Sequence, residues 1–298
     1  FSFQVDAVSS CPRPASASWK RRLEEPAMSG DYREEAVDYY DKFSGPPPGD
    51  VDFYRQFVKQ TTRVLELGCG TGRVMVPLAA PARYVHGMDH SPAMLARCQE
   101  KLEAANISAS RAQAEAGDIT DFDLLGRMPA FDLIIAPFRV IQNLESDQQV
   151  DGLMRCIKKH LTADGLAILN TFCPMSDPAT MKARWDTRDA REPAWTQPDG
   201  DGTVTLTENC SRYREHPFTM LPELTYRRYD AQSIQIGESV LTFAMRIWYP
   251  DELIHLIESH GFAVTRRFGG YEGQPWGEGT ELVVAFRHKD RSQPGDHA

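Results

Sequence analysis

The sequence lacks the marks of several classes of protein. Its six cysteines form no Cys-x-x-Cys pair, and no group of cysteines and histidines has zinc-like spacing, so we expect no metal site. No run approaches the ~18 consecutive apolar residues of a membrane-spanning helix. Basic side chains are also scarce, because 33 Lys and Arg stand against 42 Asp and Glu, for a net charge of -9. Since a nucleic-acid binder needs a basic surface, we expect neither nucleic acid nor a membrane as a partner.

What is present is the composition of an ordinary globular protein. Hydrophobic residues make up 41% and charged residues 25% of the 298 residues. This length fits one large domain or two small ones, and it is enough chain to bury a sizeable core.

The two ends of the chain show no pattern typical of a folded element. Residues 1–30 include several serines and a basic group at positions 20–22. Two interpretations stay open: the remnant of an organelle-targeting peptide, or vector or upstream sequence ahead of a start at Met28. We expect residues 1–30 and 289–298 to be disordered, and we expect the protein to act in the cytoplasm unless the first interpretation holds.

Short apolar runs alternate with amphipathic segments from residue 50 onward. The predicted strands cover residues 63–67, 83–88, 112–116, 131–136 and 166–172. The predicted helices cover residues 50–60, with Asp50 as the cap, residues 72–79, and the segments that Ser91-Pro92 and Ser146-Asp147 open. This alternation indicates a parallel, doubly wound α/β sheet. Ligands of such sheets bind beyond the carboxyl ends of the strands, so the residues that follow each strand are the candidate site.

The loop after the first strand is rich in glycine. It runs Leu67-Gly-Cys-Gly-Thr-Gly-Arg73, and its glycines permit a tight turn and a close approach of the backbone to a ligand. A dinucleotide-binding loop has the pattern G-x-G-x-x-G/A, which needs a small residue where Arg73 stands. Glu66, just before the loop, would repel a pyrophosphate but suits a ligand with an ammonium group, such as S-adenosylmethionine. The loop therefore disfavours a nicotinamide dehydrogenase.

The segment Val64-Leu-Glu-Leu-Gly-Cys-Gly-Thr-Gly-Arg73 resembles the first motif of the class I S-adenosylmethionine-dependent methyltransferases. The resemblance extends over residues 39–287 and is closest to the enzymes that methylate small molecules. It implies a Rossmann-like, seven-stranded, doubly wound sheet whose last strand is antiparallel. It also implies methyl transfer by in-line displacement to an N, O, S or C atom of a small-molecule acceptor, with S-adenosylhomocysteine as the product.

The resemblance assigns cofactor contacts to residues that follow the strands. Asp89 would accept both ribose hydroxyls, because one carboxylate offers two acceptor oxygens. Asp118-Ile119 would bind the adenine, Pro137-Phe138 would line the path of the methyl group, and Tyr40 would cover the methionine part. The alternatives are that Asp118 is a turn residue and Tyr40 a packing residue. The implied cofactor contacts are Tyr40, Glu66, Gly68, Cys69, Gly70, Gly72, Asp89, His90, Met94, Asp118, Ile119, Pro137 and Phe138.

The acceptor side of the site is less well defined. In sugar-amine N-methyltransferases of this architecture a histidine lies near the acceptor, and Asn143 stands at the matching position. Asparagine cannot act as a general base at neutral pH, so either no base is needed there or the acceptor differs. No catalytic base is identified. The acceptor-side candidates are Tyr40, Arg139, Asn143, Trp248 and Tyr249.

Residues 173–248 form an insertion that is too long for a strand-to-helix link. The segments that alternate like antiparallel strands are 204–207, 224–229 and 240–248. They predict a small antiparallel sheet over the carboxyl ends of the core strands, either as a lid over the acceptor or as the surface of a homodimer. The flanking segments 31–172 and 249–288 would make up the cofactor-binding core, the second of them as a helix and a closing hairpin.

Two further functions stay open. One is the methylation of a protein or an RNA. The acidic charge disfavours RNA, and a closed lid disfavours a protein acceptor. The other is a homologue that binds the cofactor without catalysis. Cofactor binding is expected to be retained, because Glu66, the glycine loop, Asp89 and Asp118 are all intact. These residues do not decide whether methyl transfer is retained as well.

Overall fold

The computed structural model of this chain describes residues 34–43, 47–174, 176–186, 193–209 and 212–289. The predictions made for residues 1–30, and for the tail beyond Lys289, lie outside the described residues.

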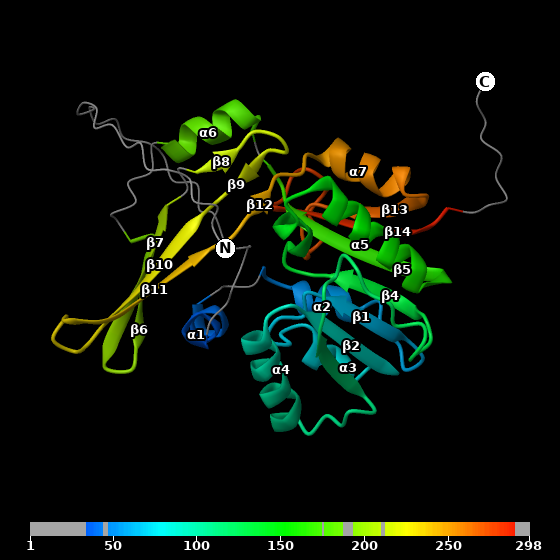
Figure 1. Cartoon of the computed structure of the whole chain (residues 1–298), viewed down its shortest axis with the longest axis horizontal. Helices are drawn as coiled ribbons and strands as arrows, with labels where there is room; N and C mark the ends of the chain where they lie inside the picture. Colours follow the sequence, from blue (N-terminus) through cyan, green and yellow to red (C-terminus); the bar gives the residue numbers. More distant parts are fainter. Residues whose placement is uncertain (1–33, 44–46, 175, 187–192, 210–211, 290–298) are drawn as a thin grey trace.

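A seven-stranded sheet forms the centre of the molecule, with the strand order β13-β14-β5-β4-β1-β2-β3 (Figure 1). Its strands are β1 (Arg63–Leu67), β2 (Tyr84–Asp89), β3 (Ala112–Ala116), β4 (Phe131–Ala136), β5 (Leu161–Phe172), β13 (Phe262–Phe268) and β14 (Glu281–His288). Strands β1 to β5 run parallel to one another, whereas β14 runs antiparallel to both β5 and β13. The predicted fold class, a doubly wound sheet with an antiparallel last strand, is therefore confirmed.

Helices cover both faces of this sheet, because alternate residues of each strand point to opposite sides. The helices are α2 (Asp50–Arg55), α3 (Met75–Ala79), α4 (Pro92–Ala104), α5 (Asp147–His160) and α7 (Pro250–Ser259), with a short 3₁₀ helix η1 (Val140–Asn143) after β4. Val64 packs in the apolar cluster of α2, α3 and α4, whereas the next residue, Leu65, packs in the cluster of α5 and α7.

Two helix starts follow the capping signals in the sequence. The Ser91 hydroxyl accepts a hydrogen bond from the Met94 amide, and Pro92 occupies the first turn of α4. Ser146 begins α5 with a capping box, in which its hydroxyl accepts from the Gln149 amide and the Gln149 side chain accepts from the Ser146 amide. Both helices begin where they were predicted to begin.

Other predicted boundaries are wrong, for identifiable reasons. Asp50 lies inside α2 and does not cap it, because its carboxylate pairs with the Arg73 guanidinium. The helix then ends at Arg55 rather than at residue 60. The helix predicted from Gly72 begins only at Met75, since Gly72 has a left-handed φ of 77°.

The fifth strand also departs from the prediction. It was expected to begin at residue 166, but β5 begins at Leu161, directly after α5. Leu161 pairs with Phe131 at the start of β4, and the register then shifts before Leu166 pairs with Leu133. The pairing with β4 therefore extends the strand back to the end of the helix.

The insertion folds as two small antiparallel sheets. A four-stranded sheet has the order β11-β10-β7-β6, and a three-stranded one has the order β12-β9-β8. The strands are β6 (Trp195–Asp199), β7 (Gly202–Asn209), β8 (Tyr213–Arg214), β9 (Thr219–Met220), β10 (Glu223–Tyr229), β11 (Gln235–Thr242) and β12 (Met245–Arg246). The strand predicted over 240–248 begins earlier, at Gln235, and is broken into β11 and β12. Helix α6 (Pro178–Asp186) was not anticipated.

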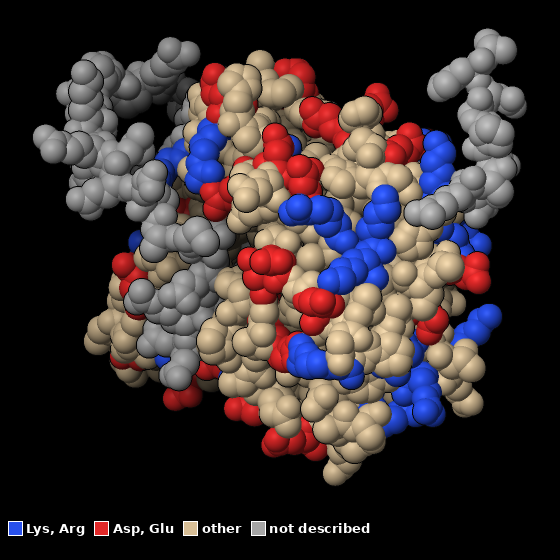
Figure 2. Space-filling model, turned by 45° about the vertical axis from the view of Figure 1, so that its right-hand side comes forward, with Lys and Arg blue, Asp and Glu red and all other residues tan. Residues whose placement is uncertain are grey.

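Helix α1 (Glu34–Phe43) lies between the four-stranded sheet and the core, beside α4 (Figure 1). Acidic and basic side chains are intermingled on the face of the molecule drawn in Figure 2. Among the described residues, no helix is long and apolar enough to cross a membrane.

Candidate functional site

The glycine-rich loop bends sharply over the end of β1 towards β2. Gly68, Gly70 and Gly72 all have positive φ angles, of 71°, 52° and 77°. The amides of Gly68 and Cys69 donate to the Met88 carbonyl at 2.7 and 3.0 Å, which holds the loop against β2. The loop is thus built from backbone geometry that glycine permits.

The three glycines differ in what surrounds them. A methyl group on Gly68 would lie 2.5 Å from Val140, and one on Gly72 would lie 2.7 Å from the Cys98 sulfur. A methyl group on Gly70 would meet no protein atom within 4 Å. The first and third glycines therefore serve close packing, whereas the space at Gly70 is open to a ligand.

Asp89, at the end of β2, faces this space. Its Oδ2 accepts from the Gly70 amide at 2.8 Å, and its Oδ1 accepts from the Ser91 amide at 2.9 Å. The residue is only 8% exposed, so these two hydrogen bonds fix its carboxylate. Each oxygen keeps the capacity to accept a second donor, as binding of two hydroxyls requires.

Glu66 lies beneath the loop on β1 and is 2% exposed. Its Oε2 has no hydrogen-bond partner among the described residues. Burial raises the pKa of Glu66 well above its ordinary value of 4.5, and the nearby Arg73 guanidinium opposes that rise. An ammonium group from a ligand would satisfy the orphan oxygen. This buried acceptor oxygen thus fits S-adenosylmethionine better than a pyrophosphate.

Tyr40, Phe138 and Arg73 meet on the other side of the loop. The ring of Phe138 lies 6.0 Å from that of Tyr40, edge to face, and 5.2 Å below the Arg73 guanidinium. Burial raises the pKa of Tyr40 to about 12, so the phenol stays neutral. Arg73 also pairs with Asp50 on α2. The sequence missed this role of Arg73. The sequence signal that could have revealed this role is that Arg73 departs from the dinucleotide-binding pattern.

The predicted adenine-side residues lie after β3 and are less enclosed. Asp118 is exposed, and its Oδ1 accepts from the amide and the hydroxyl of Thr120 at 2.8 and 2.7 Å, so the carboxylate shapes a turn. Ile119 is half-buried beside it. His90 is exposed, with its Nδ1 3.7 Å from Asp89 Oδ1, and Met94 is buried in α4.

The loop after β4 is fixed by a buried polar network. Phe138 and Arg139 both have positive φ angles, of 57° and 67°, which non-glycine residues rarely adopt. The Arg139 amide donates to Asn170 Oδ1 at 3.0 Å, and Asn170 Nδ2 donates to Glu281 Oε2 at 2.9 Å. The Arg139 guanidinium pairs with Glu281, whose carboxylate is 2% exposed. Arg139, an acceptor-side candidate, is thus engaged within the protein, and the sequence did not reveal its partners.

The remaining acceptor-side candidates lie among different neighbours. Asn143 ends η1 and is exposed, whereas its neighbour Gln142 is buried, donates to the Arg246 carbonyl at 2.8 Å and accepts from the Phe172 amide at 2.9 Å. Trp248 packs in the core cluster of α5 and α7. Its ring lies 4.1 Å from the Arg246 guanidinium, and its indole N–H has no partner among the described residues.

Tyr249 is placed apart from these residues. Its hydroxyl donates to the Ser176 carbonyl at 3.1 Å, and its ring packs beside α6. The described part of the chain contains no group of three or more His, Cys, Asp or Glu side chains arranged to hold a metal ion.

Comparisons with known proteins agree with this geometry. Residues 64–165 match the family model of a methyltransferase domain. A malonyl-[acyl-carrier protein] O-methyltransferase from Bacillus cereus is 32% identical over 114 residues, which are 37% of this chain and 37% of that protein. The chain spans about half, or less, of the length of the curated relatives it matches.

Two solved structures share the fold over most of the chain. The methyltransferase CcbJ from Streptomyces caelestis has a TM-score of 0.65 and 22% identity, covering 87% of this chain and 98% of that one. The sugar N-methyltransferase KedS8 from Streptoalloteichus has a TM-score of 0.64 and 16% identity, covering 93% of this chain and all of that one. The resemblance drawn from the glycine-rich motif is therefore confirmed for the domain and for the fold.

Proposed function

We propose, on the premise that residues 64–165 match the model of a methyltransferase domain, that this chain is an S-adenosylmethionine-dependent methyltransferase with a small-molecule acceptor. The observation that carries the proposal is the buried Glu66 carboxylate, whose Oε2 has no partner among the described residues, beneath a glycine-rich loop. A carboxylate at this place attracts an ammonium group and repels a pyrophosphate, which separates this cofactor from a dinucleotide.

Different residues of the chain would bind different parts of the cofactor. Glu66 would receive the ammonium group, and Asp89, fixed by two backbone amides, would accept from the ribose hydroxyls. Asp118-Ile119 would lie on the adenine side. Tyr40 and Phe138 cover the end that carries the methyl group, where their rings already contact one another.

Methyl transfer requires the protein mainly to align the two reactants. When bound, S-adenosylmethionine supplies a methyl group on a sulfonium, whose loss leaves a neutral thioether. Phe138 and the buried Pro137 exclude water from that region, and the network under Arg139 holds the loop in place. Alignment of two reactants in a dry site accounts for most of the rate enhancement in such a displacement. Tyr40, with a pKa of about 12, acts there as a hydrogen-bonding group and not as a base.

A small-molecule acceptor is supported by the insertion. Residues 173–248 place two small sheets beside the core, and we assign them to an acceptor lid, with a homodimer surface as the alternative. Residues 31–172 and 249–288 then form the cofactor-binding core. The sugar N-methyltransferase KedS8 shares the fold over 93% of this chain, which fits an acceptor of that size.

A cytoplasmic site of action is supported by the cysteines. Cys69, Cys98, Cys156 and Cys173 are all buried and unpaired. Free buried thiols are typical of proteins that work in a reducing compartment.

Transfer of a labelled methyl group tests the proposed function. The full chain is incubated with methyl-labelled S-adenosylmethionine and an extract of the source cells, which is then fractionated by size, with Asp89→Ala as the control. We expect label in the small-molecule fraction with the wild type and none with the variant. Label in protein or in RNA would show that the acceptor is a macromolecule and not a small molecule. No label in any fraction would contradict the enzyme activity.

A further inference from the structure

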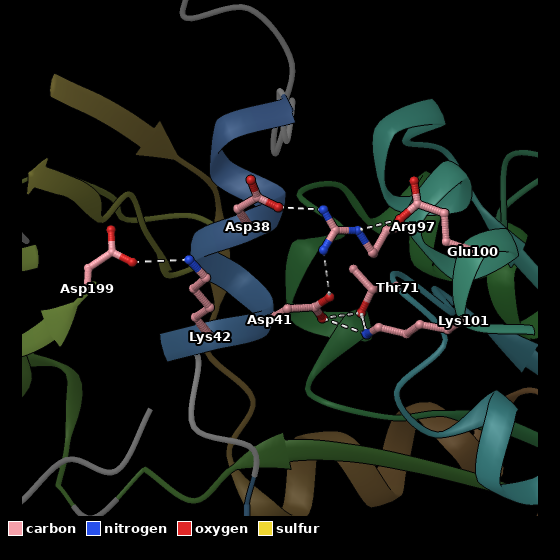
Figure 3. Close-up of polar contacts among 8 residues, drawn as sticks. All are labelled: Asp38, Asp41, Lys42, Thr71, Arg97, Glu100, Lys101 and Asp199. Carbon is pink, nitrogen blue, oxygen red and sulfur yellow. Dashed lines mark hydrogen bonds and ion pairs between the residues drawn. The ribbon is translucent and has the colours of Figure 1, made fainter. Parts of the chain in front are cut away.

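Helix α1 contacts three parts of the molecule through five consecutive residues. Residues three apart on a helix share a side. Asp38 and Asp41 accordingly point to α4, whereas Lys42 points to the four-stranded sheet (Figure 3). Tyr39, three residues before Lys42, contacts the same sheet. Tyr40, on the third side, reaches Phe138 in the candidate site. The helix thus joins the insertion to the cofactor loop.

On the core side, α1 is tied directly to the glycine-rich loop. Asp41 Oδ1 accepts from the Thr71 hydroxyl at 2.6 Å and from the Lys101 ammonium at 2.8 Å. Lys101 also donates to the Thr71 hydroxyl at 2.9 Å, which closes a triangle between α1, α4 and the loop (Figure 3). Thr71 is 1% exposed, so this hydroxyl is a buried part of the loop itself.

On the insertion side, the main contact is aromatic. The rings of Tyr39 and Tyr226 stack with their centroids 4.9 Å apart and an angle of 7° between their planes. Both residues are buried, and Tyr39 belongs to the apolar cluster of β7, β10 and β11. Lys42 adds an ion pair with Asp199 on β6 at 3.1 Å. Since the Lys42 side chain of this ion pair is exposed, the stacked tyrosines contribute most of this contact.

We propose that the small sheet sets the affinity of the cofactor site through α1, with Tyr226 and Asp199 as positioning residues that never touch the cofactor. The inference rests on the proposed function. A helix of 10 residues is not stable alone in water, so the position of α1 depends on its tertiary contacts. When α1 leaves the sheet, Asp41 leaves Thr71 and Tyr40 leaves Phe138. The apparent affinity for the cofactor then falls in proportion to the fraction of molecules whose helix is docked.

The coupling is reciprocal, as any linkage between two binding equilibria must be. A bound cofactor stabilises the docked helix, and the docked helix stabilises the sheet beside which the acceptor would bind. Cofactor binding therefore favours the assembly of the acceptor surface.

Calorimetric titration with S-adenosylhomocysteine tests this coupling on the full chain without any need for the acceptor. The variants are Tyr39→Ala and Tyr226→Ala, which remove the same contact from its two sides. Each is expected to raise the Kd about tenfold, and the double variant no further, because one contact is lost in all three. Tyr226→Phe keeps the stacked ring and is expected to stay within about threefold of the wild type.

The matched control is Arg227→Ala, on the same strand. Arg227 points to the opposite face of β10, where it pairs with Glu238 and donates to Thr207, so its loss is expected to leave the Kd within about twofold. Hydrogen exchange gives a second measurement. S-adenosylhomocysteine is expected to slow exchange over residues 37–43 in the wild type and in Arg227→Ala, but much less in Tyr226→Ala.

The outcomes separate the inference from the function on which it rests. A wild type that binds S-adenosylhomocysteine, with Tyr39→Ala and Tyr226→Ala both unchanged in Kd, overturns the coupling and leaves the function standing. A wild type that does not bind overturns the proposed function and the coupling with it. Thermal unfolding checks that each variant is folded. If Tyr226→Ala is not, Tyr39→Ala decides, because Tyr39 lies outside the sheet.

Discussion

The two halves of the large sheet hold their site residues in different ways. After β1 and β2, the contacts are local and simple: Asp89 binds the Gly70 amide, 19 positions away, and its neighbour Ser91. After β4, the contacts are distant and charged, because Arg139 depends on Asn170, 31 positions away, and on Glu281, 142 positions away. The positions of the cofactor-side residues therefore depend on local backbone geometry, whereas those of the acceptor-side residues depend on tertiary contacts. The difference predicts that the two sides respond differently to substitution.

The largest effect on stability is expected at Glu281. Glu281→Ala leaves the Arg139 guanidinium buried without its carboxylate, which typically lowers the free energy of unfolding by about 3–5 kcal/mol. Arg127→Ala is the control, because it breaks an exposed pair with Glu115 and should cost less than about 1 kcal/mol. Urea unfolding of both variants measures the difference. Equal losses would show that the network under Arg139 contributes no more than a surface pair.

The next largest effect is expected at Asp89, on cofactor binding. Asp89→Ala removes the acceptor for two ribose hydroxyls, and two charge-assisted hydrogen bonds of about 1.5 kcal/mol each correspond to a Kd weakened roughly a hundredfold. Asp121→Ala removes an exposed carboxylate from the turn after β3 and is expected to change the Kd for S-adenosylhomocysteine less than about twofold. A similar Kd for both variants, measured by calorimetry, would show that Asp89 does not bind the cofactor.

A smaller effect is expected from the ionisation of Glu66. Burial raises the pKa of Glu66 above 4.5 in the folded chain, so between that value and the raised one the folded state keeps a proton that the unfolded state has released. The free energy of unfolding therefore falls as the pH rises through this window, by at most about 1.4 kcal/mol per pH unit. Below 4.5 both states hold the proton, and the contribution is constant.

Glu66→Gln carries no ionisable group and is expected to lose that part of the pH dependence. Urea unfolding at pH values between about 5 and 8 measures it as the difference between the slopes of wild type and variant. Glu100→Gln, at an exposed position on α4, should keep the slope of the wild type. Parallel curves for Glu66→Gln and the wild type would contradict the raised pKa.

The smallest effect on stability is expected at Gly70, where the comparison with Gly200 is sharpest. Both glycines have a positive φ, of 52° and 64°, and open space where a methyl group would lie. Alanine at either position should therefore lower the free energy of unfolding by a similar amount, about 1–2 kcal/mol. Only Gly70→Ala fills the space assigned to the cofactor, so it alone should weaken binding of S-adenosylhomocysteine. Equal Kd values for the two variants would contradict that assignment.

How far the sequence could predict the molecule follows the same division. The succession of core strands along the chain, the loop glycines and the caps at Ser91 and Ser146 depend on local patterns, and these features were predicted. The partners of Arg73 and Arg139 depend on residues brought together only by the folded sheet, so no spacing revealed them.

The insertion shows the same limit within one segment. Its strand alternation indicated one small antiparallel sheet, whereas the structure contains two. The break between β11 and β12 and the presence of α6 were missed, because both depend on tertiary contacts of segments with weak periodicity. Asn143 was chosen by its place along the chain, whereas the fold buries the adjacent Gln142.

The central claim is that the carboxyl ends of β1, β2 and β3 bind S-adenosylmethionine. Competition binding tests it most directly, with S-adenosylmethionine titrated into the full chain alone, then with S-adenosylhomocysteine and with NAD as competitors. We expect S-adenosylmethionine to bind at one saturable site, from which S-adenosylhomocysteine displaces it and NAD does not. We also expect Asp89→Ala to weaken this binding. Displacement by NAD, or no saturable binding by the folded wild type, would contradict the account.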